Sequence, residues 1–121
     1  MPHILYVEDF APVLLIVTET LEAEGWQVEP CVDGARASRL VRSEAHFDLF
    51  LFDTELPILS GLELTRLARR LPHRNRTPVI LLSASEYERE ARRAGADVFL
   101  KKPEGMKTLV ENIKQLFNRQ T

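Results

Sequence analysis

The sequence predicts an α/β fold in which a five-stranded parallel sheet carries helices on both faces. Five short apolar runs rich in Val, Ile, Leu and Phe recur along the chain, and longer amphipathic segments separate them. Continuous apolar runs are typical of strands that are buried on both faces. Strands that alternate with helices form parallel sheets. The predicted strands are residues 4–7, 28–32, 48–52, 78–82 and 98–100.

Length and composition favour one domain, residues 1–121, with 45% hydrophobic and 28% charged residues. A chain of this size can bury roughly two-thirds of its unfolded surface. Cys31 is the only cysteine, which excludes an intramolecular disulfide and suits a reducing compartment. No apolar run approaches the roughly 18 residues of a membrane span, and the N-terminus lacks a signal peptide's basic start. We therefore expect a single cytoplasmic domain.

The first two helices are predicted from their ends. Pro12 opens the first helix and Gly25 closes it, and Asp33 is placed to cap the second. Four apolar residues of the first helix share one face at helical spacing, and we expect them in the core: Val13, Ile16, Val17 and Leu21. Leu15 falls on the opposite side, where one exposed leucine is ordinary.

The three later helices also have boundary signals. The S-x-x-E capping box occurs at Ser60 and again at Ser85, which predicts the starts of the third and fourth helices. Gly95 is placed to end the fourth helix, and Pro103 marks the entry to the fifth.

Besides Asp33, which is placed as a helix cap, polar residues follow the other four apolar runs. Since ligands bind beyond the carboxyl ends of the strands in open α/β sheets, we expect these side chains to meet at one edge. They are Glu8 and Asp9 after the first run, Asp53 after the third, Ser83 after the fourth, and Lys101 and Lys102 after the fifth.

This set of residue types fits phosphoryl transfer. Acids that converge repel one another unless a cation compensates, and Mg²⁺ prefers oxygen ligands. An Asp carboxylate can attack phosphorus and form an aspartyl phosphate, for which positioning and charge neutralisation suffice. Taken singly, Asp9 and Ser83 are explained as helix caps and the lysines as solvated side chains. Asp53 is harder to explain, because an unpaired carboxylate at the end of a buried strand costs several kcal/mol.

An ordered series of motifs resembles the receiver domain of two-component response regulators along the whole chain. The motifs are Ile4–Asp9, Asp53 followed by Leu56-Pro57 and Gly61, Ser83-Ala84, Gly95–Asp97, and Lys102-Pro103. The resemblance, which is to chemotaxis-regulator-like receivers, implies the flavodoxin-like strand order 2-1-3-4-5. It also implies a Mg²⁺-dependent phosphoryl acceptor that acts as a phosphorylation-controlled switch or a phosphorelay. Such a domain is not an enzyme, although it takes part in its own phosphotransfer and dephosphorylation.

The resemblance implies specific positions for the acceptor and its metal. Asp53 would be the phosphoacceptor and would also ligate Mg²⁺. Asp9 would ligate the ion directly, Glu8 largely through bound water, and Glu55 through its backbone carbonyl.

It likewise implies positions for the response to phosphorylation. Ser83 would hydrogen-bond the phosphoryl group and move toward it, and Lys102 would pair with the phosphoryl oxygens. The peptide bond before Pro103 would be cis, and Phe99 matches the aromatic residue whose rotamer reports the switch. Lys101 is one residue too early for the lysine position.

The implied partners are a histidine kinase or a histidine phosphotransfer protein, and the sequence does not identify a downstream target. The first helix, beside the acids, suits docking against such a phosphodonor. Gly95 follows Ser83 by only twelve positions, so the fourth helix is expected to be short by up to about one turn. That helix belongs to the usual output face of the family.

One arginine-rich segment is not explained by the resemblance. From Leu64 to Ser85 there is no acidic residue, yet five arginines are present: Arg66, Arg69, Arg70, Arg74 and Arg76. We interpret it first as a solvated face and alternatively as a docking site for an acidic partner. Few aromatic residues lie among these arginines, and the net charge of the chain is −2, so we do not expect direct nucleic-acid binding.

Two other functions stay open at this point. A protein-interaction module could keep the receiver fold and signal without phosphorylation, but the complete set of acids, serine and lysine counts against it. A phosphatase with an aspartyl-phosphate intermediate generally needs a substrate-enclosing cap, for which 121 residues leave no room.

Overall fold

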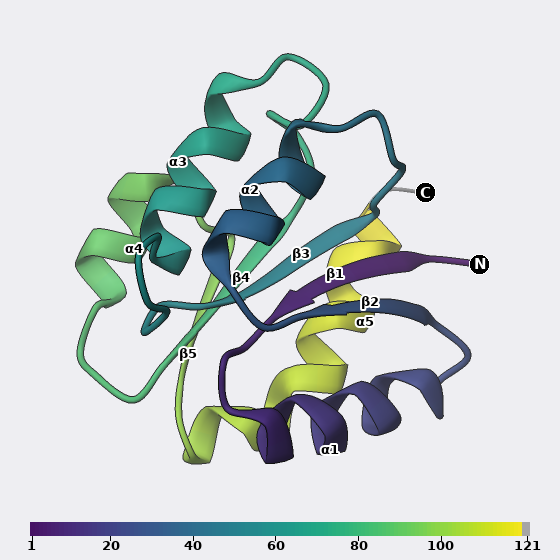
Figure 1. Ribbon diagram of the computed structural model, residues 1–121. Coiled ribbons are helices and arrows are strands. Elements are labelled where there is room, and N and C mark those ends of the chain that lie inside the picture. Colours follow the sequence, from purple (N-terminus) through teal and green to yellow (C-terminus); the bar gives the residue numbers. More distant parts are fainter. Residues whose placement is uncertain (120–121) are drawn as a thin grey trace.

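The computed structural model describes residues 1–119 and confirms the predicted architecture. Five parallel strands form one sheet in the order β2-β1-β3-β4-β5 (Figure 1). The strands are β1 (His3–Val7), β2 (Gln27–Cys31), β3 (Leu49–Asp53), β4 (Val79–Ser83) and β5 (Val98–Lys101).

Burial of the strands follows their position in the sheet. Every residue of β3 and β4 is buried, because both strands have neighbours on each side and helices above and below. The strand β2 lies at an edge of the sheet. Pro30 lacks a backbone N–H, and an edge strand tolerates it because one side of the strand needs no donors. Val32, which we placed in this strand, lies beyond its end and is half exposed.

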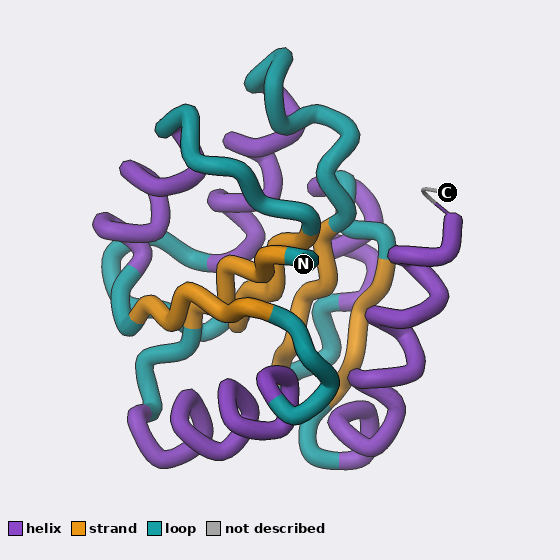
Figure 2. The backbone as a smooth tube through the Cα atoms, turned by 90° about the vertical axis from the view of Figure 1, so that its right-hand side faces the viewer, coloured by secondary structure: helices purple, strands orange, loops and turns teal. Residues whose placement is uncertain are grey.

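Helices cover both faces of the sheet (Figures 1 and 2). On one face lie α1 (Ala11–Glu22) and α5 (Leu109–Arg119), the latter preceded by a 3₁₀ turn, η1 (Glu104–Thr108). On the other lie α2 (Gly34–Arg42), α3 (Gly61–Arg70) and α4 (Glu88–Ala94). Side chains of each strand alternate between the two resulting cores: in β1, Tyr6 faces α1 and α5, whereas Val7 faces α2 to α4.

Most predicted helix boundaries are confirmed, and one is wrong. Asp33 caps α2 by accepting the backbone N–H of Arg36, Ser60 forms a complete capping box with Glu63, and Gly95 ends α4 at φ 107°. The capping box predicted at Ser85 does not form. Tyr87 occupies the N-cap of α4, and the backbone N–H of Ser85 instead donates to Ser83 Oγ at 3.0 Å. As expected, α4 is short, with seven residues.

The predicted core face of α1 is partly wrong. Val17 and Leu21 are buried, but Ile16 is 65% exposed. Leu14, which we did not place on that face, packs against the core between the sheet and the helices α1 and α5. The core-facing stripe runs through the half-buried Val13 and Leu14 and the buried Val17 and Leu21, and Ile16 lies about 100° around the helix from Val17. Ile16 and Leu15 are therefore both solvent-facing.

Arg74 joins the loop after α3 to the end of α2. Its side chain is 4% exposed, and its guanidinium lies over the rings of Phe47 and Phe50 at 5.3 and 5.6 Å. It donates hydrogen bonds to the backbone carbonyls of Leu40, Val41, Ser43 and Ala45. We call this arrangement the Arg74 clamp.

An aromatic pair fixes the other face of the sheet. Trp26, the residue before β2, meets Phe117 of α5 edge to face, with ring centroids 5.4 Å apart and an interplanar angle of 85°. Such pairs add about 1 kcal/mol beyond the area they bury. The contact holds the C-terminal helix against the segment that enters the edge strand.

Candidate functional site

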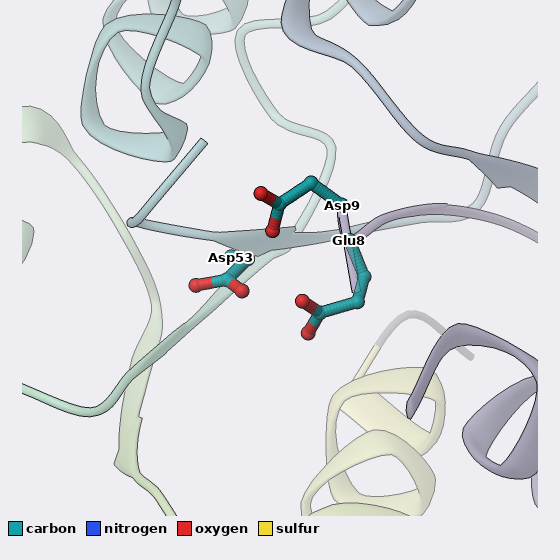
Figure 3. Close-up of side chains that lie close together, drawn as sticks. All are labelled: Glu8, Asp9 and Asp53. Carbon is teal, nitrogen blue, oxygen red and sulfur yellow. The ribbon is translucent and has the colours of Figure 1, made fainter. Parts of the chain in front are cut away.

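The three acids predicted at the carboxyl edge of the sheet lie together (Figure 3). Parallel pairing of β1 with β3 sets Val7 beside Phe52, so the residues that follow them are neighbours. Glu8, Asp9 and Asp53 each bring one carboxylate oxygen within 4.8 Å of the others. Glu8 and Asp53 are 2% and 3% exposed, whereas Asp9 is exposed. We call this group the acidic pocket.

Lys102 supplies the positive charge inside the acidic pocket. Its ammonium donates to Glu8 Oε1 at 2.8 Å and to Asp53 Oδ2 at 2.9 Å. Lys101 belongs to the same strand end but pairs with Glu86 on the surface. The Lys102–Pro103 peptide bond is cis. Of the two lysines that the sequence offered, the structure brings only the second to the acids.

The acidic pocket holds more negative than positive charge. The shifts in the pKa values of Asp53 and Lys102 reflect this excess. Burial raises the pKa of Asp53 to about 6, with a further increase from its hydrogen bond to Glu8; the Lys102 ammonium and the Glu55 N–H act in the opposite direction. Burial lowers the pKa of Lys102, but its hydrogen bonds to the two carboxylates outweigh this, and the net shift is upward. One ammonium thus compensates two buried carboxylates only in part.

Tyr6 is another buried polar residue near the acids whose polar group is not compensated within residues 1–119. Its side chain is fully buried, and its hydroxyl has no hydrogen-bond partner among the described residues. Burial raises the pKa of the phenol, and the charges of Glu8 and Asp53 raise it further. A tyrosine inside the first apolar run was visible in the sequence, but its proximity to the acids depends on the strand pairing.

Ser83 and the backbone of Ala84 form a pair of donors beside Asp53. Ser83 is fully buried, and its hydroxyl donates to Glu55 Oε2 at 2.8 Å. The N–H of Ala84 donates to Glu55 Oε1 at 2.8 Å, and the N–H of Glu55 itself donates to Asp53 Oδ1 at 3.0 Å. The Ser83–Ala84 donor pair therefore binds anionic oxygens in this structure, and those oxygens belong to Glu55.

From the sequence we expected Glu55 to act through its backbone carbonyl, and the role of its side chain was missed. The available signal was an acid two residues beyond Asp53, in a loop that leaves β3 next to the end of β4. That position alone does not show whether the carboxylate turns to solvent or toward the neighbouring strand.

Close packing fixes the loop that carries Glu55. A Cβ on Gly61 would lie 2.2 Å from the backbone oxygen of Asp53, so only glycine lets α3 begin against the end of β3. Ile58 in this loop has φ 71° and is 92% exposed. The loop is thus held at its two ends and turned outward between them.

Phe99 lies apart from the acids. It is half-buried on β5 beside Leu81 of β4, and it packs against the core on the side of α2 to α4. A larger groove, of about 700 Å³, lies at the opposite edge of the sheet near His3, Trp26 and His46 and contains none of the predicted site residues.

The donor set of the acidic pocket fits a hard divalent cation. Carboxylate oxygens are ligands that Mg²⁺ accepts, usually one or two together with waters and phosphate oxygens. Three converging carboxylates with one ammonium leave a net negative charge that such an ion would neutralise. The pocket joins this cation site to donors for anionic oxygens.

Comparisons with known proteins agree with this arrangement. The response regulator receiver domain family matches residues 4–114. The phosphate regulon transcriptional regulatory protein PhoB of Rhizobium meliloti is 34% identical over 122 residues, which cover 98% of this chain and 53% of that protein. The chain therefore spans about half the length of this relative.

Solved structures show the same fold. The receiver domain of the Francisella response regulator 1452 superposes with a TM-score of 0.89 at 27% identity over the full length of both chains. The receiver domain of the sensor histidine kinase PA1611 from Pseudomonas aeruginosa, solved with a magnesium ion in its active-site cleft, superposes with a TM-score of 0.86 at 29% identity. That match covers 97% of this chain and 98% of that one.

The helices add one further finding: none within residues 1–119 is long and apolar enough to cross a membrane. The five parallel strands are in the order that the resemblance implied; Glu8 and Asp9 follow β1, Asp53 ends β3 and Lys102 follows β5. By fold, by sequence and by family match, this chain belongs to the receiver domains of two-component response regulators.

Proposed function

We propose that the chain accepts a phosphoryl group on Asp53 and works as a phosphorylation-controlled switch or relay in the cytoplasm, with residues 1–121 as one unit. The observation that carries the proposal is the position of Asp53, buried between two other acids, the Lys102 ammonium and the Ser83–Ala84 donor pair. A carboxylate that is costly to bury and surrounded by groups for a cation and an anion suits a covalent acceptor.

Four groups of this chain would hold Mg²⁺: the carboxylates of Asp9 and Asp53, the backbone carbonyl of Glu55, and Glu8 largely through water. The bound ion would supply positive charge against the phosphoryl oxygens. Asp53 is mostly ionised above pH 6, so at neutral pH one of its oxygens can form a bond to phosphorus. In the same step the bond between phosphorus and the leaving nitrogen or oxygen of the donor breaks.

The other residues would respond to the added charge. In this proposal Lys102 and the Ser83–Ala84 donor pair hydrogen-bond the phosphoryl oxygens, and the carboxylate of Glu55 gives up its two donors. Movement of Ser83 would be followed by Phe99 on the neighbouring strand, which changes the surface near α4 and β5. Phosphorylation thereby shifts an existing equilibrium between two conformations.

The relatives support a histidine kinase or a histidine phosphotransfer protein as the phosphodonor. One solved neighbour is the receiver domain of a sensor histidine kinase, and a curated relative is a transcriptional regulator. Receiver domains are signalling domains and are generally not classed as enzymes. Participation in its own dephosphorylation is part of our proposal for this chain.

Intact mass after incubation with Mg²⁺ and acetyl phosphate tests the proposal. We expect a gain of one phosphoryl group that hydroxylamine removes and that Asp53→Asn lacks. Asp33→Asn is the matched control, because asparagine also caps helices and Asp33 lies outside the pocket. A hydroxylamine-labile adduct that persists on Asp53→Asn contradicts the assignment of Asp53.

One observation favours the alternative, an interaction module that signals without phosphorylation. The carboxylate of Glu55 already occupies the Ser83–Ala84 donor pair, as an anionic group would in a permanently engaged state. If acetyl phosphate gives no adduct and beryllofluoride with Mg²⁺ leaves the NMR spectrum of the pocket unchanged, this alternative is the better one.

A further inference from the structure

The structure divides four of the five arginines of residues 64–85 into two kinds, and the fifth, Arg76, is exposed in the loop after α3. Arg74 forms the clamp, and Arg69 donates to the backbone carbonyls of Thr77 and Gly95 and pairs with Asp97. These two side chains hold loops together. Arg66 and Arg70 point from the exposed side of α3 and have no ion pair among the described residues.

A groove of about 250 Å³ between α2 and α3 brings the exposed arginines together. Arg42 of α2 lines it with Arg66 and Arg70 of α3. Among the described residues, the side chain of Arg42 makes one hydrogen bond, a long one of 3.4 Å from Nε to Ser38 Oγ. Leu59 and Leu67 give the groove an apolar part. Arginines on both helices thus face the same space, which we call the α2–α3 groove.

Stabilisation of the helix ends accounts for these arginines only in part. Cations in the last turn of a helix interact favourably with its dipole, and Arg42 and Arg70 lie in the last turns of α2 and α3, but Arg66 lies in the middle of α3. The carbonyls at the end of α2 already accept hydrogen bonds from Arg74. Three guanidinium groups therefore share one groove, and among residues 1–119 the only acid that lines it is Glu63, which is engaged in the capping box.

We propose that the α2–α3 groove binds an acidic segment of a partner protein, with carboxylates on Arg42, Arg66 and Arg70 and an apolar side chain against Leu59 and Leu67. Guanidinium forks match carboxylates in bidentate pairs. The groove differs from a nucleic-acid site, because no aromatic residue lines it for base stacking, one end carries Glu63, and the chain has a net charge of −2. This surface is separate from the acidic pocket and does not depend on phosphorylation of Asp53.

The test follows binding of a short peptide of glutamates with two leucines to the ¹⁵N-labelled chain by NMR and fluorescence anisotropy at about 50 mM salt, where screening is weak. We expect chemical-shift changes centred on residues of α2 and α3. A peptide in which serine replaces both leucines should bind more weakly, since it keeps the charge and loses the apolar contact.

A pair of double variants separates the groove from general charge. Arg66→Gln with Arg70→Gln should weaken binding about tenfold, since each exposed ion pair contributes a few-fold in affinity. Arg89→Gln with Arg93→Gln removes the same charge from exposed positions of α4, outside the groove, and should change affinity less than twofold. Glutamine keeps helix propensity close to that of arginine.

Four results would overturn the proposal: equal weakening by both double variants, shifts centred outside α2 and α3, tighter binding of a single-stranded oligonucleotide of equal charge to the same arginines, or groove resonances that shift with protein concentration alone. Asp53→Asn should bind the peptide as the natural chain does. A failure of the groove proposal would therefore appear in the arginine variants, and a failure of the phosphoacceptor assignment would appear in Asp53→Asn.

Discussion

The Arg74 clamp and the acidic pocket both bury charged side chains, but they satisfy them in opposite ways. Arg74 meets four backbone carbonyls and two aromatic rings and, within residues 1–119, no carboxylate. Burial lowers its pKa, an effect that the charge of Glu44 partly offsets. In the acidic pocket one ammonium is shared by two buried carboxylates, and a third acid lies beside them.

The difference separates structural burial of charge from functional burial. A charged group whose hydrogen bonds are complete stabilises the fold as long as both partners stay in place. A group of like charges with incomplete compensation destabilises the fold until a ligand arrives, which is the pattern expected of a site. Stability measurements on matched variants can test this distinction.

The largest effect is expected at the clamp. Arg74→Met removes the buried cation that four backbone carbonyls share, and we expect the free energy of unfolding to fall by about 3–5 kcal/mol. Urea denaturation followed by circular dichroism measures it. Arg76→Met, on the exposed part of the same loop, should stay within about 0.5 kcal/mol. A loss below about 1 kcal/mol at Arg74 would mean that the clamp is not a structural element.

The acidic pocket should respond in the opposite direction. In metal-free buffer at pH 7.5, Asp53→Asn should raise the free energy of unfolding by about 2–3 kcal/mol, because it removes a carboxylate whose pKa is raised from 3.8 to about 6. The unfolded chain holds this acid at its ordinary pKa, so ionisation between about pH 4 and 6 costs the folded state more.

The pH dependence of the free energy of unfolding gives the sign of the contribution of Asp53. Stability of the natural chain should be greatest below about pH 4 as far as Asp53 is concerned, and this contribution should be lost as the pH rises through 6. Urea denaturation from pH 4.5 to 8 with EDTA should show a flatter profile for Asp53→Asn than for Asp33→Asn. Parallel profiles for the two variants would contradict the excess of negative charge in the pocket.

A smaller effect is expected from Glu55, which links the pocket to its donor pair. Glu55→Ala frees Ser83 and Ala84, and we expect phosphorylation by acetyl phosphate to become roughly fivefold faster, the equivalent of about 1 kcal/mol for one displaced charged acceptor. Glu86→Ala removes an acid that pairs with Lys101 on the surface and serves as the control. A slower reaction in Glu55→Ala would show that the carboxylate assists phosphorylation rather than competing with it.

The smallest effect is expected at Tyr6. Tyr6→Phe removes a buried hydroxyl without a hydrogen-bond partner, and stability should rise by about 1 kcal/mol. Thermal denaturation of the two proteins compares them directly. A loss of stability would indicate that the hydroxyl is satisfied in solution, for example by water inside the pocket.

The fold and the acidic pocket could be predicted because each depends on local patterns. Asp53 directly follows four buried apolar residues, and parallel strands bring their carboxyl ends to one edge whatever the details of packing. The same patterns were ambiguous where the choice depended on tertiary contacts. Ile16 and Leu14 are both apolar, and only the position of α1 on the sheet decides that Leu14 packs against the core while Ile16 is exposed.

The arginines and Glu55 show a second limit. Five arginines in one segment look alike in the sequence, but Arg74 is buried because the carbonyls at the end of α2 lie within its reach. Glu55 and Ser83 are 28 residues apart and meet because β3 and β4 are neighbours. Pairings of long polar side chains over such separations depend on geometry that composition does not contain.

The contact of Trp26 with Phe117 determines what optical spectroscopy can observe in this protein. Trp26 is the only tryptophan. It lies before the first residue of β2, at the amino-terminal end of the parallel strands, whereas Asp53 lies at their carboxyl end. Its emission should therefore report detachment of α5 and remain nearly constant when a cation or a phosphoryl group enters the pocket. An unfolding curve followed by fluorescence and a binding curve followed by NMR can then be recorded on the same sample without interfering with each other.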